Sequence, residues 1–242
     1  IAGGNAAGAL RWLAGRCPHF RSERLCNEAI LTALGANVQR GARDDATENM
    51  IVAGGNAADA LSHLAERCLD GMVERLCNRA ILTALGASVQ RGARDDATEN
   101  LIIAGGNAAG ALRWLAGRCP AEMIERLCDG ATLAALGVSA RRGARDGAAF
   151  ASTFAGRESL NVLCKIAKRW SAGSAPTKAQ LKVLASSSIE GSETRLAVLM
   201  SASRRWSTWL ANVIVHDAEE LLSEEISPSH INDLVCHVGS VK

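Results

Sequence analysis

The sequence predicts an all-α fold, a right-handed α-α superhelix (solenoid) of three-helix repeats of 51 residues. The repeat is visible in one stretch, AGGNAADALSHLAERC, which runs from Ala53 to Cys68. It recurs as AGGNAAGALRWLAGRC from Ala2 and from Ala104, and a divergent copy, AGRESLNVLCKIAKRW, begins at Ala155. A fixed period of this length is typical of solenoids, because each unit buries its apolar face only against its neighbours.

The composition also favours helices. Aromatic residues make up 3% of the 242 residues and tyrosine is absent, whereas sandwiches and barrels need β-branched and aromatic residues. The net charge of +2 is neither the strong positive field of a dedicated nucleic-acid-binding domain nor that of an acidic tail. No lysine precedes Lys165. Arginine suits bidentate recognition of phosphate or carboxylate, but we favour the simpler explanation of a GC-rich genome.

Each element can be predicted within the unit from Asp44 to Arg94. Residues 45–48 have the form of a capping box, with a carboxylate at the N-cap and Glu at N3. A short helix is expected to follow and to stop at Gly54-Gly55, since glycine adopts the left-handed C′ conformation without steric cost. Asn56 is then expected to be the N-cap of a second helix.

Two apolar stripes at helical spacing define the second and third helices. The second helix carries Ala57, Ala60, Leu61, Leu64, Ala65 and Cys68. After a turn at 69–71, the third helix carries Val73, Cys77, Ala80, Ile81, Ala84 and Leu85, and ends near Gly86 or Gly92. The polar segment QRGARDDAT links it to the next unit.

These features resemble the armadillo/HEAT-type helical-repeat family. The resemblance lies in Asn49-x-Ile51-Val52-Ala53-Gly54-Gly55, followed by Ala60-Leu61-x-x-Leu64-Ala65, and covers about residues 1–170. The family has three helices per unit, with a Gly-rich turn between the first two, so the resemblance implies a solenoid that binds proteins. The period departs from the family's shorter unit. In a second alignment NAAGALRWLA is the family's third helix, and its peptide-binding asparagine is replaced by Trp12, His63 or Trp114.

A second resemblance concerns RNA. The pattern Asn-Ala-Ala-x-Ala-Leu-x-Trp-Leu-Ala, followed by RLCNEAILTAL, is similar to octotricopeptide-type organellar repeats. That resemblance implies RNA binding in a plastid or mitochondrion. The units are nearly identical over 38–47 and 89–98, whereas a module that reads one base per unit would vary its reading residues.

The remaining chain, residues 171–242, is interpreted as degenerate helical repeats that cap the array of residues 1–170. The small-residue segment 171–177 breaks the period. Helices are expected at about 178–186 and 193–222, with a last one after Ser227, where Ser-Pro suits the N-cap and N1 positions. A terminal unit needs the polar outer face that this segment offers.

The sharpest candidate for a binding site is a ladder of flat or cationic side chains, which we call the ring–arginine ladder. It comprises two residues per unit, four apart, which share a helix face: Trp12 and Arg16, His63 and Arg67, Trp114 and Arg118, Lys165 and Arg169. The ladder is suited to an acidic partner or to stacking on RNA bases. Alternatively, each arginine covers the neighbouring unit and pairs with an acid such as Glu74 or Glu125, which we favour.

A second charged set is interpreted as inter-repeat ion pairs on a solvated edge. It contains Arg40, Arg43 and Asp44 with their copies Arg91, Arg94, Asp95, Arg142, Arg145 and Asp146. Opposite charges this close usually satisfy one another.

No residues are assigned to catalysis, to a metal or to a cofactor. The five histidines, His19, His63, His216, His230 and His237, lie in no nucleophile or zinc motif, and Cys236-His237 with His230 lacks the paired Cys spacing of structural zinc. Cys17, Cys68 and Cys119 recur at one position and Cys26, Cys77 and Cys128 at another. We therefore expect free buried thiols, which suit an intracellular, reducing compartment.

The first functional hypothesis is a non-enzymatic protein-interaction scaffold, a structural subunit of a larger assembly that binds protein partners. The alternative is an organellar RNA-binding solenoid, for example one associated with a ribosome. A third option is a helical-repeat lyase or chaperone subunit whose partner chain supplies the chemistry. The chain has no run of 18 apolar residues, so no membrane span is expected. It opens at Ile1 within a repeat, so we expect the natural product to begin earlier.

Overall fold

A computed structural model describes residues 2–16, 25–120, 123–127, 129–144 and 147–169, and within these ranges the fold is all-α, without strands. The helices are α1 (Ala2–Arg16), α3 (Glu28–Gly41), α4 (Glu48–Arg67), α5 (Asp70–Leu76), α6 (Arg79–Ala93), α7 (Glu99–Arg118), α8 (Ile124–Leu127), α9 (Gly130–Ala144) and α10 (Phe150–Arg169). None of the helices described here is long and apolar enough to cross a membrane.

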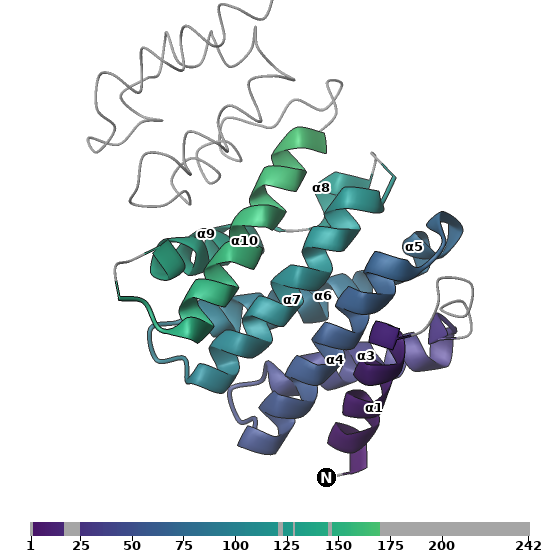
Figure 1. Ribbon diagram of the computed structural model, residues 1–242, viewed down its shortest axis with the longest axis horizontal. Coiled ribbons are helices and arrows are strands. Elements are labelled where there is room, and N and C mark those ends of the chain that lie inside the picture. The colour runs from purple at the N-terminus through teal and green to yellow at the C-terminus, as the bar shows by residue number, and fades with distance from the viewer. Residues whose placement is uncertain (1, 17–24, 121–122, 128, 145–146, 170–242) are drawn as a thin grey trace, which may run out of the picture.

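The helices form two rows (Figure 1). In the first row α1, α4, α7 and α10 pack side by side in chain order; in the second, α3, α6 and α9 do the same. Each second-row helix also packs against the first-row helix that follows it, α3 on α4, α6 on α7 and α9 on α10. A continuous apolar core joins the rows and includes Leu34, Leu61, Leu85, Leu112 and Leu136, all fully buried. The amphipathic stripes of the sequence therefore meet between the two rows.

The glycine pair at 54–55 does not end a helix, and this prediction was wrong. The helix α4 runs without a break through Gly54, Gly55 and Asn56, and α7 does the same through its own glycine pair. Asn56 therefore lies inside a helix and is not an N-cap. A glycine here costs about 1 kcal/mol of helix propensity relative to alanine, so its presence requires another reason.

That reason is close packing between the two rows. A Cβ on Gly92 would lie 2.7 Å from the carbonyl oxygen of Leu101 and 3.1 Å from the Cα of Gly105. The same pairing recurs one unit earlier and one unit later, between Gly41 and Gly54 and between Gly143 and Gly156. The glycines therefore let each second-row helix cross the next first-row helix with backbone against backbone, where no Cβ fits.

The predicted third helix is two helices. It breaks at Cys77-Asn78 into the short α5 and the longer α6, because Asn78 adopts an extended conformation and its side chain accepts a hydrogen bond from the amide of Ile81 at 2.9 Å. Asn27 caps α3 in the same way, with 2.9 Å to the amide of Ile30. The unit thus contains one helix of 20 residues, one of 7 and one of 15.

The predicted capping box is not formed. The N-cap of α4 is Thr47, which makes no side-chain cap bond, and Asp45 instead receives two hydrogen bonds from Arg43, of 2.8 and 2.9 Å. The link between units is also shorter than predicted, since α6 continues to Ala93 and only residues 94–98 connect it to α7. The interpretation of 171–242 as a cap, with helices at 178–186, at 193–222 and after Ser227, lies outside the described residues.

Candidate functional site

The ring–arginine ladder lies at the C-terminal ends of the first-row helices. Trp12 and Arg16 are on α1, His63 and Arg67 on α4, Trp114 and Arg118 on α7, and Lys165 and Arg169 on α10. Since these four helices pack side by side, the eight residues share one edge of the molecule (Figure 1).

Arg118 caps the preceding helix of its row. Its guanidinium donates to the carbonyl oxygens of Ala65 at 2.8 Å, Glu66 at 3.0 Å and Cys68 at the end of α4. It also pairs with the carboxylate of Asp70 at 2.8 Å. The last carbonyls of a helix have no partner within that helix and lie at the negative end of its dipole, so a cation with several donors stabilises them.

Arg169 repeats this arrangement one unit later. It donates to the carbonyl oxygens of Ala116 at 3.0 Å and Cys119 at 2.6 Å, at the end of α7. The interpretation in which the arginine covers the neighbouring unit therefore describes Arg118 and Arg169. Among the described side chains Glu74 is not their partner, and most of their acceptors are backbone carbonyls. Sequence reasoning missed this role because a backbone acceptor leaves no signal in the residue types.

The ring positions of the ladder carry a different set of contacts. The guanidinium of Arg16 lies 4.6 Å from the ring centre of Trp12, and the Trp114 ring is approached by Arg113 at 4.6 Å and by the Lys165 ammonium at 4.9 Å. Cations over an indole face interact favourably with its quadrupole. Trp12 is 57% exposed, whereas Trp114 is half-buried and packs on the core.

Carboxylates not assigned from the sequence lie among these rings. Asp59 pairs with Arg11 and lies 3.8 Å from the Nε2 of His63, whose Nδ1 is 3.6 Å from Glu66. Two units later, the buried Glu158 pairs with Arg113 at 3.2 Å. Part of the positive charge beside the ring positions is therefore paired with nearby carboxylates. The sequence offered only a weak signal for these pairs, since their members are 45 and 48 residues apart.

The second charged set does form inter-repeat pairs. Asp44 accepts a hydrogen bond from Arg94 at 2.9 Å and forms an ion pair with Arg91 at 3.2 Å, and Arg142 lies 3.4 Å from Asp95. The exposed carboxylate of Asp44 shows that this edge is solvated. Two hydrogen bonds from Arg94, two residues earlier in the chain, lower the pKa of Asp96. Arg145 and Asp146 lie outside the described residues.

Four cysteines whose side chains are described are buried and form no disulfide, as expected: Cys26, Cys68, Cys77 and Cys119. A hydrogen bond with the Cys119 thiol, together with burial, raises the pKa of Cys77. A hydrogen bond with Cys26, supported by the charge of Arg118, lowers the pKa of Cys68 despite its burial. These thiols belong to the core, because each lies in the apolar cluster between the rows.

Within the described ranges, no three His, Cys, Asp or Glu side chains come together as a metal site would require. His63 is described, whereas the other four histidines and Cys236 lie outside these ranges. The chain matches no protein-family model, no curated protein and no solved structure. Partner binding by the eight ladder residues stays a prediction, and its geometry is the basis of the proposal that follows.

Proposed function

We propose that the chain is a non-enzymatic protein-interaction scaffold, a structural subunit of a larger assembly, built as a right-handed α-solenoid of armadillo-like units. The solenoid is supported by bonds between equivalent places in successive units. Arg118 reaches Ala65, 53 residues earlier, and Arg169 reaches Ala116, again 53 residues earlier. Asn107 likewise donates to the carbonyl oxygen of Gly55, 52 residues earlier, at 3.1 Å. Units joined by equivalent contacts form an array that exposes a repeated surface.

The observation that carries the proposal is that the arginines and the ring positions of the ring–arginine ladder make different kinds of contact. Arg118 and Arg169 cap helices, so their contribution is to hold units together. The ring positions, Trp12, His63 and Trp114, lie one turn earlier and line the edge that remains accessible. Partly exposed tryptophans beside arginines are typical of the residues that dominate protein–protein interfaces.

A protein partner suits this edge better than RNA. Asp59, Glu66 and Glu158 lie among the ring positions and pair with some of the nearby cations. RNA affinity depends on uncompensated positive charge that displaces counterions from phosphates. The Trp114 ring is also in contact with two cations, which leaves it less available for stacking on a base.

The test uses the tagged full chain expressed in its native cells, with partners identified by affinity purification and chemical cross-linking. Wild type and the control Arg75→Gln, an exposed arginine outside the ladder, should recover the same protein. The double variant Trp12→Ala/His63→Ala should lose it. Recovery of this chain alone, or equal recovery by the double variant, would count against the proposal.

A separate experiment tests the RNA-binding alternative. Single-stranded RNA is titrated at two salt concentrations with wild type and with Arg16→Ala/Arg67→Ala/Arg118→Ala, checked for folding by circular dichroism. The proposal expects weak binding that the substitutions do not change. Tight, salt-dependent binding that the triple variant loses would replace the scaffold by an RNA-binding role.

A further inference from the structure

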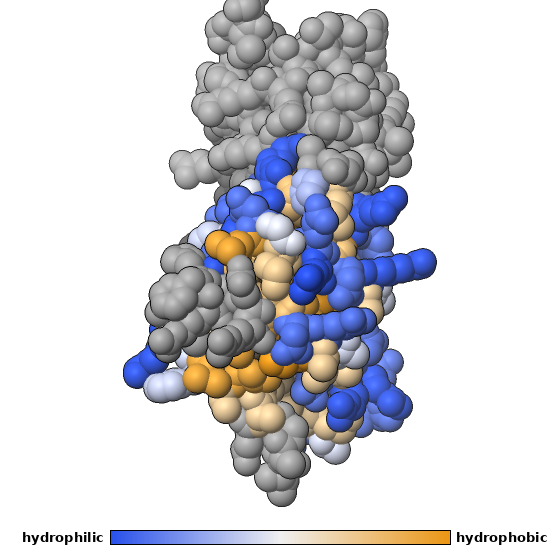
Figure 2. All heavy atoms as spheres, turned by 90° about the vertical axis from the view of Figure 1, so that its right-hand side faces the viewer, coloured by the Kyte–Doolittle hydropathy of each residue, from blue (hydrophilic) through white to orange (hydrophobic). Residues whose placement is uncertain are grey.

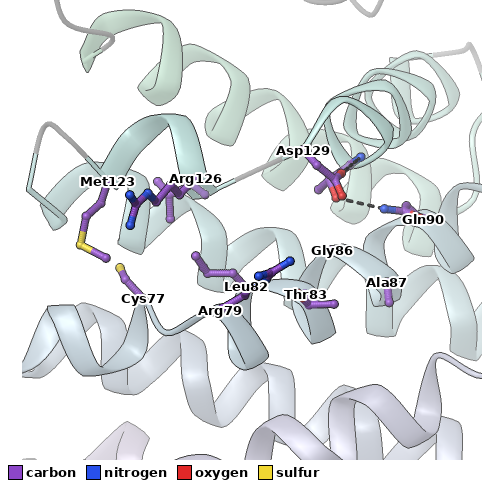
Figure 3. Close-up of a pocket in the computed structure, with 12 residues that line it drawn as sticks. Cys77, Arg79, Leu82, Thr83, Gly86, Ala87, Gln90, Met123, Arg126 and Asp129 are labelled. Atoms are coloured by element: carbon purple, nitrogen blue, oxygen red, sulfur yellow. Dashed lines mark hydrogen bonds between the residues drawn. The ribbon is translucent and has the colours of Figure 1, made fainter.

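A pocket lies at the second row of helices, on helices other than the four that carry the ladder. It has a volume of about 670 Å³ and lies between α6 on one side and α8 and the start of α9 on the other. Figure 3 shows Met123 and Arg126 on one side of the space, facing Cys77, Leu82 and Arg79 on the other. This volume falls in the usual range of ligand pockets, roughly 300 to 1,000 Å³.

The pocket combines an apolar lining with two arginine cations. Leu82, Met123 and Leu127 supply the apolar surface. The exposed guanidiniums of Arg79 and Arg126 make no hydrogen bond or ion pair with any described residue. This is unlike Arg118, Arg142 and Arg169, which are each held by several carbonyl oxygens.

One acid also lines the pocket, and it is already engaged. A carboxylate oxygen of Asp129 accepts from the amide of Thr132 at 2.7 Å at the start of α9. The Thr132 hydroxyl in turn accepts from Gln90 at 3.1 Å. With two guanidiniums and one carboxylate, the described residues of the lining carry a net positive charge that an anionic ligand would complement.

The preceding unit provides an internal comparison. The α3–α6 interface is the equivalent, one unit earlier, of the α6–α9 interface that contains the pocket. The comparison is informative because α3 and α6 are almost identical in sequence. Arg79 of the pocket corresponds to Glu28 one unit earlier, which is a reversal of charge. Thr132 of the pocket corresponds to the buried Ile81, which lies 3.4 Å from the position that a Cβ on Gly35 would take. The interface that contains the pocket therefore differs from its neighbour at two of the positions that give the pocket its charge and polarity.

The pocket is elongated along α6. Its lining begins at Arg79 and reaches Gln90, eleven residues later, which corresponds to about 16 Å at a rise of about 1.5 Å per residue. An extended peptide of about five residues covers that length at about 3.3 Å per residue. The amide of Gln90 and the hydroxyl of Thr83 can bond to a peptide backbone, which a compact anion would not need.

We propose that this pocket binds an acidic peptide segment of a partner protein. The carboxylates of the segment pair with Arg79 and Arg126, and an apolar side chain rests on Leu82, Met123 and Leu127. The site is independent of the ring–arginine ladder, so the molecule holds one partner on each row of helices.

To test this, phage that display random dodecapeptides are selected for binding to the purified full chain. Enriched peptides are then synthesised and titrated by fluorescence anisotropy. We expect enrichment of Asp or Glu next to Leu, Phe or Met, and micromolar binding that weakens at least tenfold in Arg79→Glu and in Arg126→Gln. Thr132→Ile, which restores the residue of the preceding unit, should also weaken binding. Arg75→Glu, the same change of charge outside the pocket, should stay within twofold of wild type.

Circular dichroism confirms that each variant is folded. Absence of enrichment, peptides without acidic residues, or equal affinity for Arg79→Glu and Arg126→Gln would overturn the proposal. A parallel titration with dodecanoate covers a small anionic amphiphile. If dodecanoate binds with the same sensitivity to the variants while no peptide is enriched, the peptide proposal is also overturned.

Discussion

Arg142 donates a hydrogen bond of 2.8 Å to the carbonyl oxygen of Ala93, one unit earlier at the end of α6. The same guanidinium donates to Gly92 at 3.0 Å and to Arg94 at 2.9 Å. The second row of helices thus uses the capping arrangement of Arg118 and Arg169 in the first row. In α7, α9 and α10, an arginine near the C-terminus thus donates to carbonyl oxygens at the C-terminus of the preceding helix in the same row.

The first prediction concerns Arg142→Lys. A lysine keeps the charge but cannot reach three carbonyls with a planar fork, so we expect a loss of about 1 to 2 kcal/mol in the free energy of unfolding. Urea denaturation followed by circular dichroism measures it. Arg75→Lys, at an exposed position without such bonds, is the control and should be neutral. Equal stability of the two variants would remove the capping role.

A second prediction concerns Gly92→Ala. Its Cβ would lie 2.7 Å from the oxygen of Leu101, a backbone atom that cannot move aside. We expect a loss of about 1 to 3 kcal/mol despite the better helix propensity of alanine. Gly71→Ala is the matched control, because a Cβ there meets nothing within 4 Å, and it should stabilise by roughly 0.5 to 1 kcal/mol. The same sign for both substitutions in thermal melts would refute the close crossing.

A third prediction compares two N-caps. Asn78→Ala removes the bond to the amide of Ile81 and should cost about 1 kcal/mol. Thr47→Ala should cost a small fraction of this, since Thr47 makes no side-chain cap bond. The chemical-denaturation midpoints of the two variants test the difference. A larger loss for Thr47→Ala would mean that α4 depends on its first turn in a way these contacts do not explain.

A fourth prediction follows from the raised pKa of Cys77. The unfolded thiol ionises near pH 8.5, whereas the folded thiol stays protonated. Above that pH the unfolded chain binds fewer protons, so this group's contribution, fully present below pH 8.5, is lost as the pH rises. The melting temperature should fall between pH 7 and pH 9.5, and fall less in Cys77→Ala. Identical falls would contradict the assignment. Cys68 is present in both proteins, so its opposite shift does not distort the comparison.

The sequence was sufficient to predict the all-α class, because alanine and leucine are abundant and recur at helical spacing. It was misleading at Gly54-Gly55, where the local tendency of glycine to end a helix is overridden by the crossing with Gly41. The break before α6 could have been found, since Asn27 and Asn78 are good N-caps one unit apart. The asparagine signal was outweighed by the apolar stripe that runs through Cys77.

The candidate site was predictable as a set of positions but not in its contacts. The recurrence of Trp12, His63 and Trp114 with an arginine four residues later showed which residues share an edge. The acceptors of Arg118 are carbonyls on the preceding unit, and the partner of Arg113 is Glu158, in a divergent unit. Neither contact can be read from residue types. The acceptors of Arg118 are backbone atoms, and Glu158 stands where the earlier units have an asparagine.

The measurement that tests the central claim most directly is a pair of melting temperatures, those of Arg118→Met and Trp12→Ala. The account assigns Arg118 to the joint between units and Trp12 to the accessible edge. Loss of the charged bonds of Arg118 should cost about 2 kcal/mol, or about 4 to 8 °C for a chain of this size. Trp12→Ala should melt within about 1 °C of wild type, because the ring is largely exposed. If Trp12→Ala melts several degrees lower while Arg118→Met is unchanged, the division between joint and surface is contradicted.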